Sequence, residues 1–243
     1  MLFKKPKTYI TPGGEAPALY SQLISEPHLL IAGATGSGKS VLINSLIARL
    51  LMGSSPATAK LILIDPKKVE LAALAKLPHC IGYADTAETA KIELTEAVNI
   101  MMSRYGDMRK RNLKNHDGDH IYIIIDEYAD LMVQAKKSIE PLITRIVQLG
   151  RAANIHLIIA TQRPTREVIA GAIRVNLDCK IALHTATAQD SRNIIEAKGA
   201  EALPRFGYGY ILNPDGLNPY KLPDISDKLP GLINFWTSKN CIA

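Results

Sequence analysis

The stretch HLLIAGATGSGKSVLINSLIARLL, residues 28–51, contains an apolar run, a glycine-rich turn and a second apolar run in direct succession. The first run is uninterrupted, which is typical of a strand buried on both faces of a parallel sheet, and the second has helical spacing. Between them, GATGSGKS at residues 33–40 matches the pattern G-x-x-x-x-G-K-[ST] in full. Pattern and context predict a phosphate-binding loop rather than a glycine-rich turn that only caps a helix.

The residue types of this loop suit a nucleotide. Glycines let the backbone curve around phosphates without a clash from Cβ, while N–H groups and the helix N-terminus supply positive potential. We expect Lys39 to reach the β- and γ-phosphates and Ser40 to place its hydroxyl on Mg²⁺. The residues predicted to bind the nucleotide are Gly33, Ala34, Thr35, Gly36, Ser37, Gly38, Lys39, Ser40 and Val41.

Four more apolar runs resemble the one at 28–33, and they lie at residues 60–65, 121–126, 155–161 and 179–185. Segments with helical periodicity alternate with them, at 39–52, 86–112, 138–152, 166–176 and about 188–198. We expect the long segment 86–112 to bend or stop near Gly106. The alternation predicts an α/β fold with a doubly wound, mainly parallel sheet covered on both faces.

The pattern changes beyond Gly199. The stretch FGYGYILNPDGLNPYKL predicts a C-terminal β-hairpin that turns at NPDG and pairs at the sheet edge. The final stretch, DKLPGLINFWTSKNCIA, gives no clear signal, and no second domain is indicated.

Composition and charge exclude several classes of protein. The chain has 243 residues, 47% of them hydrophobic, but no apolar run of the about 20 residues that span a bilayer. It starts MLFKKPKTYITPGGE, which lacks the apolar segment of a signal peptide. We therefore expect a cytoplasmic protein, associated with a membrane only through a partner or a missing N-terminal region. Its cysteines and histidines form no pattern of a disulfide, a zinc site or a nucleophile, and the net charge of +6 favours an anionic partner.

Two acidic residues stand at the end of the run IYIIID, where Asp126 is followed by Glu127. A carboxylate at the end of a buried strand needs a cation or hydrogen-bond donors, so Asp126 is expected to hold Mg²⁺, directly or through water. Glu127 points elsewhere because successive strand residues alternate, which suits a base or an orienting group for attacking water. The structural alternative is that Asp126 caps the next helix.

Gln162 follows the run IHLIIAT and is expected at the same sheet edge. There it could sense the γ-phosphate or orient water, although a glutamine in a turn can also contact solvent alone. Lys39, Glu127 and Gln162 are thus the predicted catalytic residues, and Ser40 and Asp126 the predicted metal ligands. The set specifies hydrolysis, and the lack of an NKxD-like stretch favours ATP over GTP, with Mg²⁺ as cofactor.

Several stretches closely resemble the motor domain of the FtsK/SpoIIIE family. They are HLLIAGATGSGKSVLINSLI, ILIDPKKVELA, IIIDEYADLM, RAANIHLIIATQRPTREVIAGAIRVN and DSRNIIEAKGAEALPRFGYGYIL. The resemblance implies a RecA-like P-loop NTPase that hydrolyses ATP and moves double-stranded DNA through a homohexameric ring. It divides the chain into an N-terminal extension (1–26), the motor domain (27–212) and a C-terminal tail (213–243).

The resemblance also assigns individual residues. Lys39 and Ser40 become the Walker A pair, Asp126 and Glu127 the Walker B pair, and Gln162 the sensor. A cation from the adjacent subunit is expected in the strand after IRVN, where this chain has Lys180; other candidates are Arg192, Arg163 and Arg151. Lysine supplies the charge but not the bidentate fork of arginine.

DNA contacts are expected from basic loops that line the pore. The candidates are Arg109, Lys110, Arg111, Lys114, Lys136, Lys137 and Arg166. They would contact phosphates and show little sequence preference. The alternative is that MRKRNLKN is a solvated helix face.

Three functions stay open at this point. The leading one is a translocase for double-stranded DNA, in chromosome or plasmid segregation, conjugative transfer or packaging, with a membrane or DNA-processing protein as a further partner. The second is a secretion ATPase that acts on polypeptide cargo. The third is a nucleotide-gated assembly module that hydrolyses little, which Glu127 and Gln162 disfavour.

Overall fold

The computed structural model describes residues 16–238. Within this range the chain forms an eight-stranded sheet in the order β3-β2-β4-β5-β1-β6-β7-β8. The strands are β1 (His28–Ala32), β2 (Ala59–Ile64), β3 (Cys80–Ala84), β4 (His120–Ile125), β5 (Ile155–Thr161), β6 (Cys179–Ala182), β7 (Tyr208–Asn213) and β8 (Gly216–Lys221). Strands β1 to β6 pair in parallel, and β7 and β8 add an antiparallel hairpin, so the predicted sheet and edge hairpin are confirmed.

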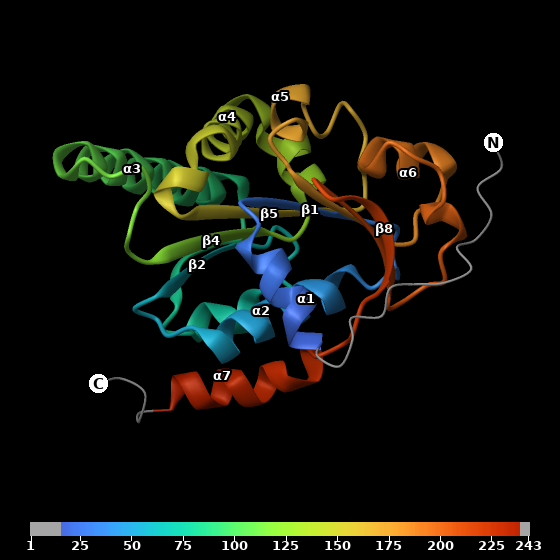
Figure 1. The fold of residues 1–243 in the computed structure, drawn as a ribbon, viewed down its shortest axis with the longest axis horizontal. Helices are drawn as coiled ribbons and strands as arrows, with labels where there is room; N and C mark the ends of the chain where they lie inside the picture. Colours follow the sequence, from blue (N-terminus) through green and yellow to red (C-terminus); the bar gives the residue numbers. More distant parts are fainter. Residues whose placement is uncertain (1–15, 239–243) are drawn as a thin grey trace.

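Helices cover both faces of the sheet (Figure 1). One face carries α3 (Ala87–Arg111), α4 (Tyr128–Leu149) and α5 (Gly171–Arg174), and the other carries α1 (Ala16–Ser25), α2 (Lys39–Gly53) and α7 (Leu229–Thr237). The remaining helix, α6 (Ala188–Ile195), packs against β6, and short 3₁₀ turns lie at Ala72–Lys76, Arg151–Ala153, Ala200–Ala202 and Ser226–Lys228.

The central parallel strands are apolar over most of their length because each face of the sheet has its own core. In β1, Leu30 and Ala32 pack in the cluster under α3 and α4, whereas Leu29 and Ile31 pack in the cluster with α2. Alternate side chains of a strand point to opposite faces, so a strand covered on both sides is apolar on both; in β1 and β5 the polar residues His28, His156 and Thr161 stand at or next to the strand ends.

The helix α3 differs from the sequence expectation, because it continues through Gly106 and ends only at Asn112, whose φ is 55°. Gly106 is exposed, whereas Met101 and Met108 on either side of it are buried. Packing of this face outweighs the intrinsic cost of about 1 kcal/mol for a glycine in a helix.

Other boundaries also differ. The helix predicted from 138 begins at Tyr128, and the predicted start lies just beyond a kink at Ala135, where φ is −147° and ψ is 34°. Only α5 is helical in the segment 166–176, because Ala170 has an extended ψ of 150°. The edge strand β3 was not predicted, since it is short, contains Gly82 and is only partly buried.

Of the C-terminal stretch without a sequence signal, Leu229–Thr237 forms α7, which packs on α2, and residues 239–243 lie outside the described range. Trp236 Nε1 donates to the carbonyl of Leu51 at 3.1 Å, and Ile225 N donates to Ser45 Oγ at 3.2 Å. From α1, the Tyr20 hydroxyl donates to the carbonyl of Pro223. Among residues 16–238, no helix combines the length and the apolar character needed to cross a bilayer.

Candidate active site

The parallel strands β2, β4, β5 and β1 are neighbours in this order, and their C-terminal ends form what we call the carboxyl edge of the sheet. The loop of residues 33–38 leaves this edge after β1 and leads directly into α2. Gly36 and Gly38 have φ of 71° and 97°, which favour glycine, and a Cβ on Gly33 would lie 2.5 Å from Ser37 Oγ. The predicted glycine-rich turn is therefore built as its sequence requires.

Lys39 is 8% exposed at the start of α2. Burial lowers the pKa of Lys39, and the nearby carboxylates of Glu127 and Asp126 oppose this shift. A partly desolvated ammonium group at a helix N-terminus attracts an anion strongly, because little water competes for it.

Asp126 lies beyond the end of β4 and is 4% exposed. Its Oδ1 has no hydrogen-bond partner among the described residues. Burial raises the pKa of Asp126 to about 6; Lys39 acts against this shift, while Asp65 and Glu70 add to it. A buried carboxylate surrounded by other carboxylates is stabilised by a bound cation.

Glu127 is 2% exposed and points to the neighbouring strand β5. Its Oε1 accepts hydrogen bonds from Thr161 Oγ1 at 2.8 Å and from Gln162 N at 3.1 Å, and Lys67 Nζ lies 3.4 Å from its Oε2. Glu127 occupies the N-cap position of α4 without making a side-chain cap bond, so capping by Asp126 is not seen.

Gln162 turns toward the phosphate loop. Its Oε1 accepts a hydrogen bond from Thr35 Oγ1 at 2.6 Å, which joins the end of β5 to the loop after β1. The side chain is half-buried, so solvent is not its only contact.

Asp65 and Glu70, which sequence reasoning did not select, complete the carboxyl edge. Asp65 is fully buried beyond the end of β2, and its Oδ2 accepts from Glu70 N at 3.0 Å and from Leu71 N at 2.9 Å. Ser40 Oγ donates to Glu70 Oε1 at 2.8 Å. Asp65 ends the apolar run KLILID just as Asp126 ends IYIIID, so the signal that identified Asp126 was also present here.

The residues at this edge fit a hard divalent cation. Asp65 Oδ1 and Asp126 Oδ1 are buried without hydrogen-bond partners in the described part of the chain, and the Ser40 hydroxyl adds a third oxygen. No group of three or more His, Cys, Asp or Glu residues within 16–238 could hold a metal alone. Mg²⁺ needs no such group, because it keeps several waters and takes oxygens from substrate phosphates.

An apolar cavity of about 390 Å³ lies beside Gly38 and Val41. Its walls also include Tyr20, Leu42, Leu183, Phe206, Gly207, Leu222, Pro223 and Asp224. A Cβ on Gly38 would lie 3.6 Å from Phe206 Cα, so the segment before β7 closes directly over the loop. The cavity is large enough and apolar enough to hold the base and sugar of a nucleotide.

The residues predicted to supply a cation to the site of the adjacent subunit lie in different parts of the fold. Lys180 is 12% exposed, and its Nζ lies 3.5 Å from Glu196 Oε1 of the same chain. Arg192 is exposed on α6, and Arg163 is exposed directly after Gln162. Arg151 precedes β5 and so lies at the opposite, amino edge of the sheet, where β2, β4 and β5 begin.

The candidate DNA-binding residues fall into two separate groups, and all are exposed. Arg109, Lys110 and Arg111 form the last turn of α3, followed by Lys114, near the amino edge; Arg111 Nη1 lies 3.0 Å from Asp107 Oδ2. Lys136 and Lys137 follow the kink of α4, where Lys136 Nζ donates to the carbonyl of Glu167 at 2.8 Å, one residue after Arg166.

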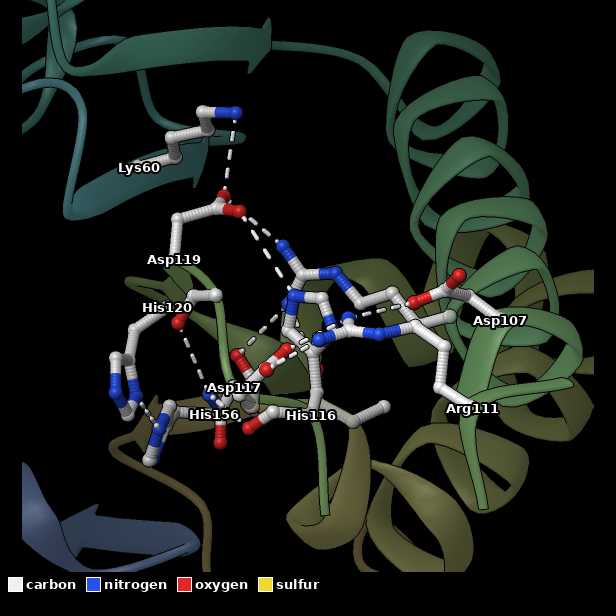
Figure 2. A network of polar contacts seen from close by, with 12 residues as sticks. Lys60, Asp107, Arg111, His116, Asp117, Asp119, His120 and His156 are labelled. Atoms are coloured by element: carbon white, nitrogen blue, oxygen red, sulfur yellow. Dashed lines mark hydrogen bonds and ion pairs between the residues drawn. The ribbon is translucent and has the colours of Figure 1, made fainter. Parts of the chain in front are cut away.

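A network of polar side chains closes the amino edge (Figure 2). Arg104 is 8% exposed and donates to Asp119 Oδ2 at 2.9 Å and to the carbonyl of Ala153 at 2.7 Å. His120 Nδ1 and His156 Nε2 are 2.9 Å apart, and burial lowers the pKa of His156 to about 4. Most polar groups of this network bond to each other or to backbone carbonyls, whereas both ring nitrogens of His116 are buried without a hydrogen-bond partner among the described residues.

Comparison with known proteins gives a consistent match. The family model described as FtsK/SpoIIIE family matches residues 10–123 and 115–166. A DNA translocase FtsK of Oceanobacillus iheyensis is 42% identical over 206 residues, which cover 76% of this chain and 26% of that protein. The chain thus spans about a quarter of the length of the curated relatives it matches.

Two solved structures are similar as well. The pCW3 conjugation coupling protein TcpA, in a monomer form with ATPγS, has a TM-score of 0.73 and 26% identity, over 86% of this chain and 66% of that one. The cytoplasmic domain of the Thermomonospora curvata type VII secretion ATPase EccC has a TM-score of 0.72 and 27% identity, over 81% of this chain and 25% of that one. The predicted P-loop ATPase fold is confirmed.

Proposed function

Because the chain belongs to the FtsK/SpoIIIE family, we propose that it is an ATP-hydrolysing motor that translocates double-stranded DNA through a homohexameric ring. The observation that carries the proposal is the meeting of Lys39, Asp126, Glu127 and Gln162 at one edge of the sheet, next to an intact phosphate loop. Segregation of chromosomes or plasmids and conjugative transfer are the processes that such a motor serves.

The residues would divide the work of hydrolysis as follows. The loop of residues 33–41 holds the phosphates, and Lys39 neutralises the β- and γ-phosphates. Ser40 and Asp126 would hold Mg²⁺, which would supply charge neutralisation on the phosphate oxygens. Glu127 takes a proton from the attacking water, and Gln162 orients that water or senses the γ-phosphate.

The apolar cavity beside Gly38 would receive the adenosine part of ATP. Its walls come from α1, the phosphate loop and start of α2, Leu183 after β6 and the segment 206–224, so a nucleotide would contact parts of the chain that are far apart in the sequence. Filling the cavity with Val41→Trp should weaken binding of a fluorescent ATP analogue while inorganic triphosphate still competes.

The proposals of a hexameric ring and of a DNA path through it rest on family membership alone. A cation from the neighbouring subunit would complete the site, with Lys180 and Arg192 as candidates, and Arg109, Lys110, Arg111, Lys136 and Lys137 would contact DNA phosphates. The motor domain would occupy residues 27–212. Action in the cytoplasm, with membrane association through a partner, is part of the same proposal.

The deciding experiment measures the ATPase rate against DNA length and form, with the oligomer mass determined in the same samples. Duplex DNA should stimulate hydrolysis, Lys39→Ala should abolish it, and stimulation should fall between roughly 50 and 200 mM salt because phosphate contacts release counterions. A hexamer whose rate ignores DNA at low salt would overturn the proposal.

The same assay tests the alternative, a secretion ATPase acting on polypeptides. The likeness to EccC is compatible with that function but does not favour it over DNA transport. Stimulation by a polypeptide substrate together with indifference to DNA would establish it.

A further inference from the structure

The segment from Asp65 to Leu71, between β2 and the 3₁₀ turn at Ala72–Lys76, reaches both halves of the nucleotide site. Glu70 Oε1 accepts a hydrogen bond from Ser40 Oγ at 2.8 Å. Three positions earlier, Lys67 Nζ lies 3.4 Å from Glu127 Oε2. One short segment therefore touches the hydroxyl expected to bind the metal and the carboxylate expected to act as the base.

The segment is fixed by its own backbone. Both oxygens of Asp65 are buried, and its Oδ2 accepts from the N–H groups of Glu70 and Leu71 at 3.0 and 2.9 Å. Lys68 adopts a φ of 60°, a conformation that costs a residue with a Cβ about 1 kcal/mol, and its N–H bonds to the carbonyl of Asp65 at 3.0 Å. Such a local cost persists where the surrounding contacts determine the turn.

The residues that anchor the segment are not the residues that contact the nucleotide site. Asp65 and Leu71 are fully buried and hold the two ends of the segment, whereas Lys67 is 40% exposed and Glu70 is half-buried. Removing either reaching side chain therefore leaves the buried anchors in place.

We propose that Glu70 and Lys67 are positioning residues for the nucleotide site. A hydroxyl has one proton and two lone pairs, so a Ser40 that donates to Glu70 keeps its lone pairs for a cation. The bond to a carboxylate is charge-assisted, which fixes the hydroxyl rotor more firmly than a neutral acceptor would. Thr161 donates to the first oxygen of Glu127, the N–H of Gln162 donates to both oxygens at 3.1 and 3.2 Å, and Lys67 is the side chain that donates to the second oxygen.

This inference rests on the proposed ATPase function and adds to it the groups that orient its metal ligand and its base. Positioning partners of metal ligands change metal affinity by about 10–100-fold when they are removed. Loss of Glu70 should therefore act on the magnesium-dependent part of nucleotide binding and leave the magnesium-free part unchanged.

The first test measures binding of a fluorescent ATP analogue to the full chain, in excess Mg²⁺ and in EDTA. We expect Glu70→Ala to weaken binding about tenfold in Mg²⁺ but not in EDTA, and to raise the Mg²⁺ concentration at half-maximal binding by a similar factor. Glu70→Gln, which still accepts a hydrogen bond, should recover most of the affinity. The control is Val69→Ala, because the Val69 side chain is 73% exposed on the same segment.

The outcomes separate this inference from the function on which it rests. A wild-type chain that binds no ATP refutes the proposed function. Binding by the wild type with the same Mg²⁺ dependence in Glu70→Ala, or equal losses in Mg²⁺ and EDTA, refutes the positioning role of Glu70. If Glu70→Ala does not fold, Glu70→Met, which keeps the length of the side chain but has no carboxylate to accept the bond, replaces it: a Mg²⁺ dependence equal to that of Val69→Ala refutes the positioning role.

The second test concerns Lys67. Lys67→Met should lower kcat about three- to tenfold while KM for ATP stays within twofold, since the base is misplaced but the phosphate loop is intact. Lys67→Arg should restore kcat, because its guanidinium can also donate to Glu127. An unchanged kcat in Lys67→Met, or a loss confined to KM, would overturn this part.

Discussion

The carboxyl and amino edges of the same sheet both bury polar side chains, but they differ in how these are satisfied. At the amino edge, Arg104 is neutralised by Asp119, and His120 and His156 bond to each other (Figure 2). At the carboxyl edge, the carboxylates of Asp65 and Asp126 each keep a buried oxygen without a hydrogen-bond partner among residues 16–238.

The two edges also differ in the charge of the buried groups that have no hydrogen-bond partner. Within residues 16–238, the unpartnered buried ring nitrogens near the amino edge belong to His28, His79 and His116, which are neutral because burial lowers their pKa. At the carboxyl edge the unpartnered atoms in the same range include the hydroxyls of Ser37 and Tyr128 and, above all, the carboxylate oxygens of Asp65 and Asp126. An uncompensated carboxylate costs far more than a neutral ring nitrogen or a hydroxyl. The contrast supports the proposal that a ligand completes the carboxyl edge, whereas the amino edge serves the stability of the fold.

The largest expected effect is on chemistry at the carboxyl edge. Glu127→Gln keeps an acceptor oxygen for Thr161 and Gln162 but loses the basic carboxylate, so the ATPase rate should fall about 10²–10⁴-fold. Nucleotide affinity should change little, as judged with a fluorescent ATP analogue. Turnover close to that of the wild type would remove Glu127 from the mechanism.

At the amino edge the corresponding change should affect stability alone. Arg104→Ala leaves Asp119 without its buried partner and should lower the free energy of unfolding by about 3 kcal/mol in urea titration. The control is Lys60→Ala, which removes the 37% exposed partner of the same carboxylate and should cost less than about 1 kcal/mol. If Arg104→Ala also lowers the ATPase rate per folded molecule, the amino edge does not affect stability alone, and the contrast with the carboxyl edge fails.

The next expected effect is a gain in stability rather than a loss. The pKa of Asp126 is about 6 in the folded chain, above its ordinary value of 3.8, so its ionisation destabilises the ligand-free fold as pH rises through this window. Asp126→Asn should therefore raise the free energy of unfolding by about 1–3 kcal/mol near neutral pH, with no gain below about pH 4. Stability gained together with lost ATP hydrolysis would mark a functional carboxylate; a less stable variant at neutral pH would contradict the assignment.

The smallest expected effect is a pH slope at the amino edge. Burial lowers the pKa of His156 from 6.5 to about 4, so the unfolded chain binds the proton more readily and stability falls as pH drops from 6.5 toward 4. His156→Gln should reduce this loss by about 1 kcal/mol near pH 5, measured as the difference between urea titrations at two pH values. If the loss of stability at low pH is the same in His156→Gln, then His156 does not cause it.

The sequence predicted the carboxyl edge well because its signals are local. A strand followed by GATGSGKS, and acids directly after a second strand, determine both the fold and the place of Lys39 and Asp126. Asp65 carried the same signal and was overlooked, whereas Glu70 and Lys67 carried none, since only the turn after β2 brings them to Ser40 and Glu127.

Other features could not be predicted because they depend on tertiary packing. The kink at Ala135 lies six residues before Pro141, beyond the carbonyl four positions back that a proline ring meets, and β3 is a strand mainly because β2 offers it a partner. The mutual bond of His120 and His156 requires that β4 and β5 begin side by side, 36 positions apart in the chain. Contacts of this range leave no trace in a local pattern.

The segment that follows β7 also determines how the protein can be handled. Strand β8 covers the free side of β7, and Leu222, Ile225 and Leu229 are buried in the same apolar cluster as α2. Ending the chain at residue 212 would remove β8 and the buried residues after it. It would also remove one wall of the cavity beside Gly38 and leave the backbone N–H and C=O groups of β7 free to pair with another molecule. Shortened forms would thus be prone to aggregate, and a fair assay of the motor requires the C-terminal segment to be kept.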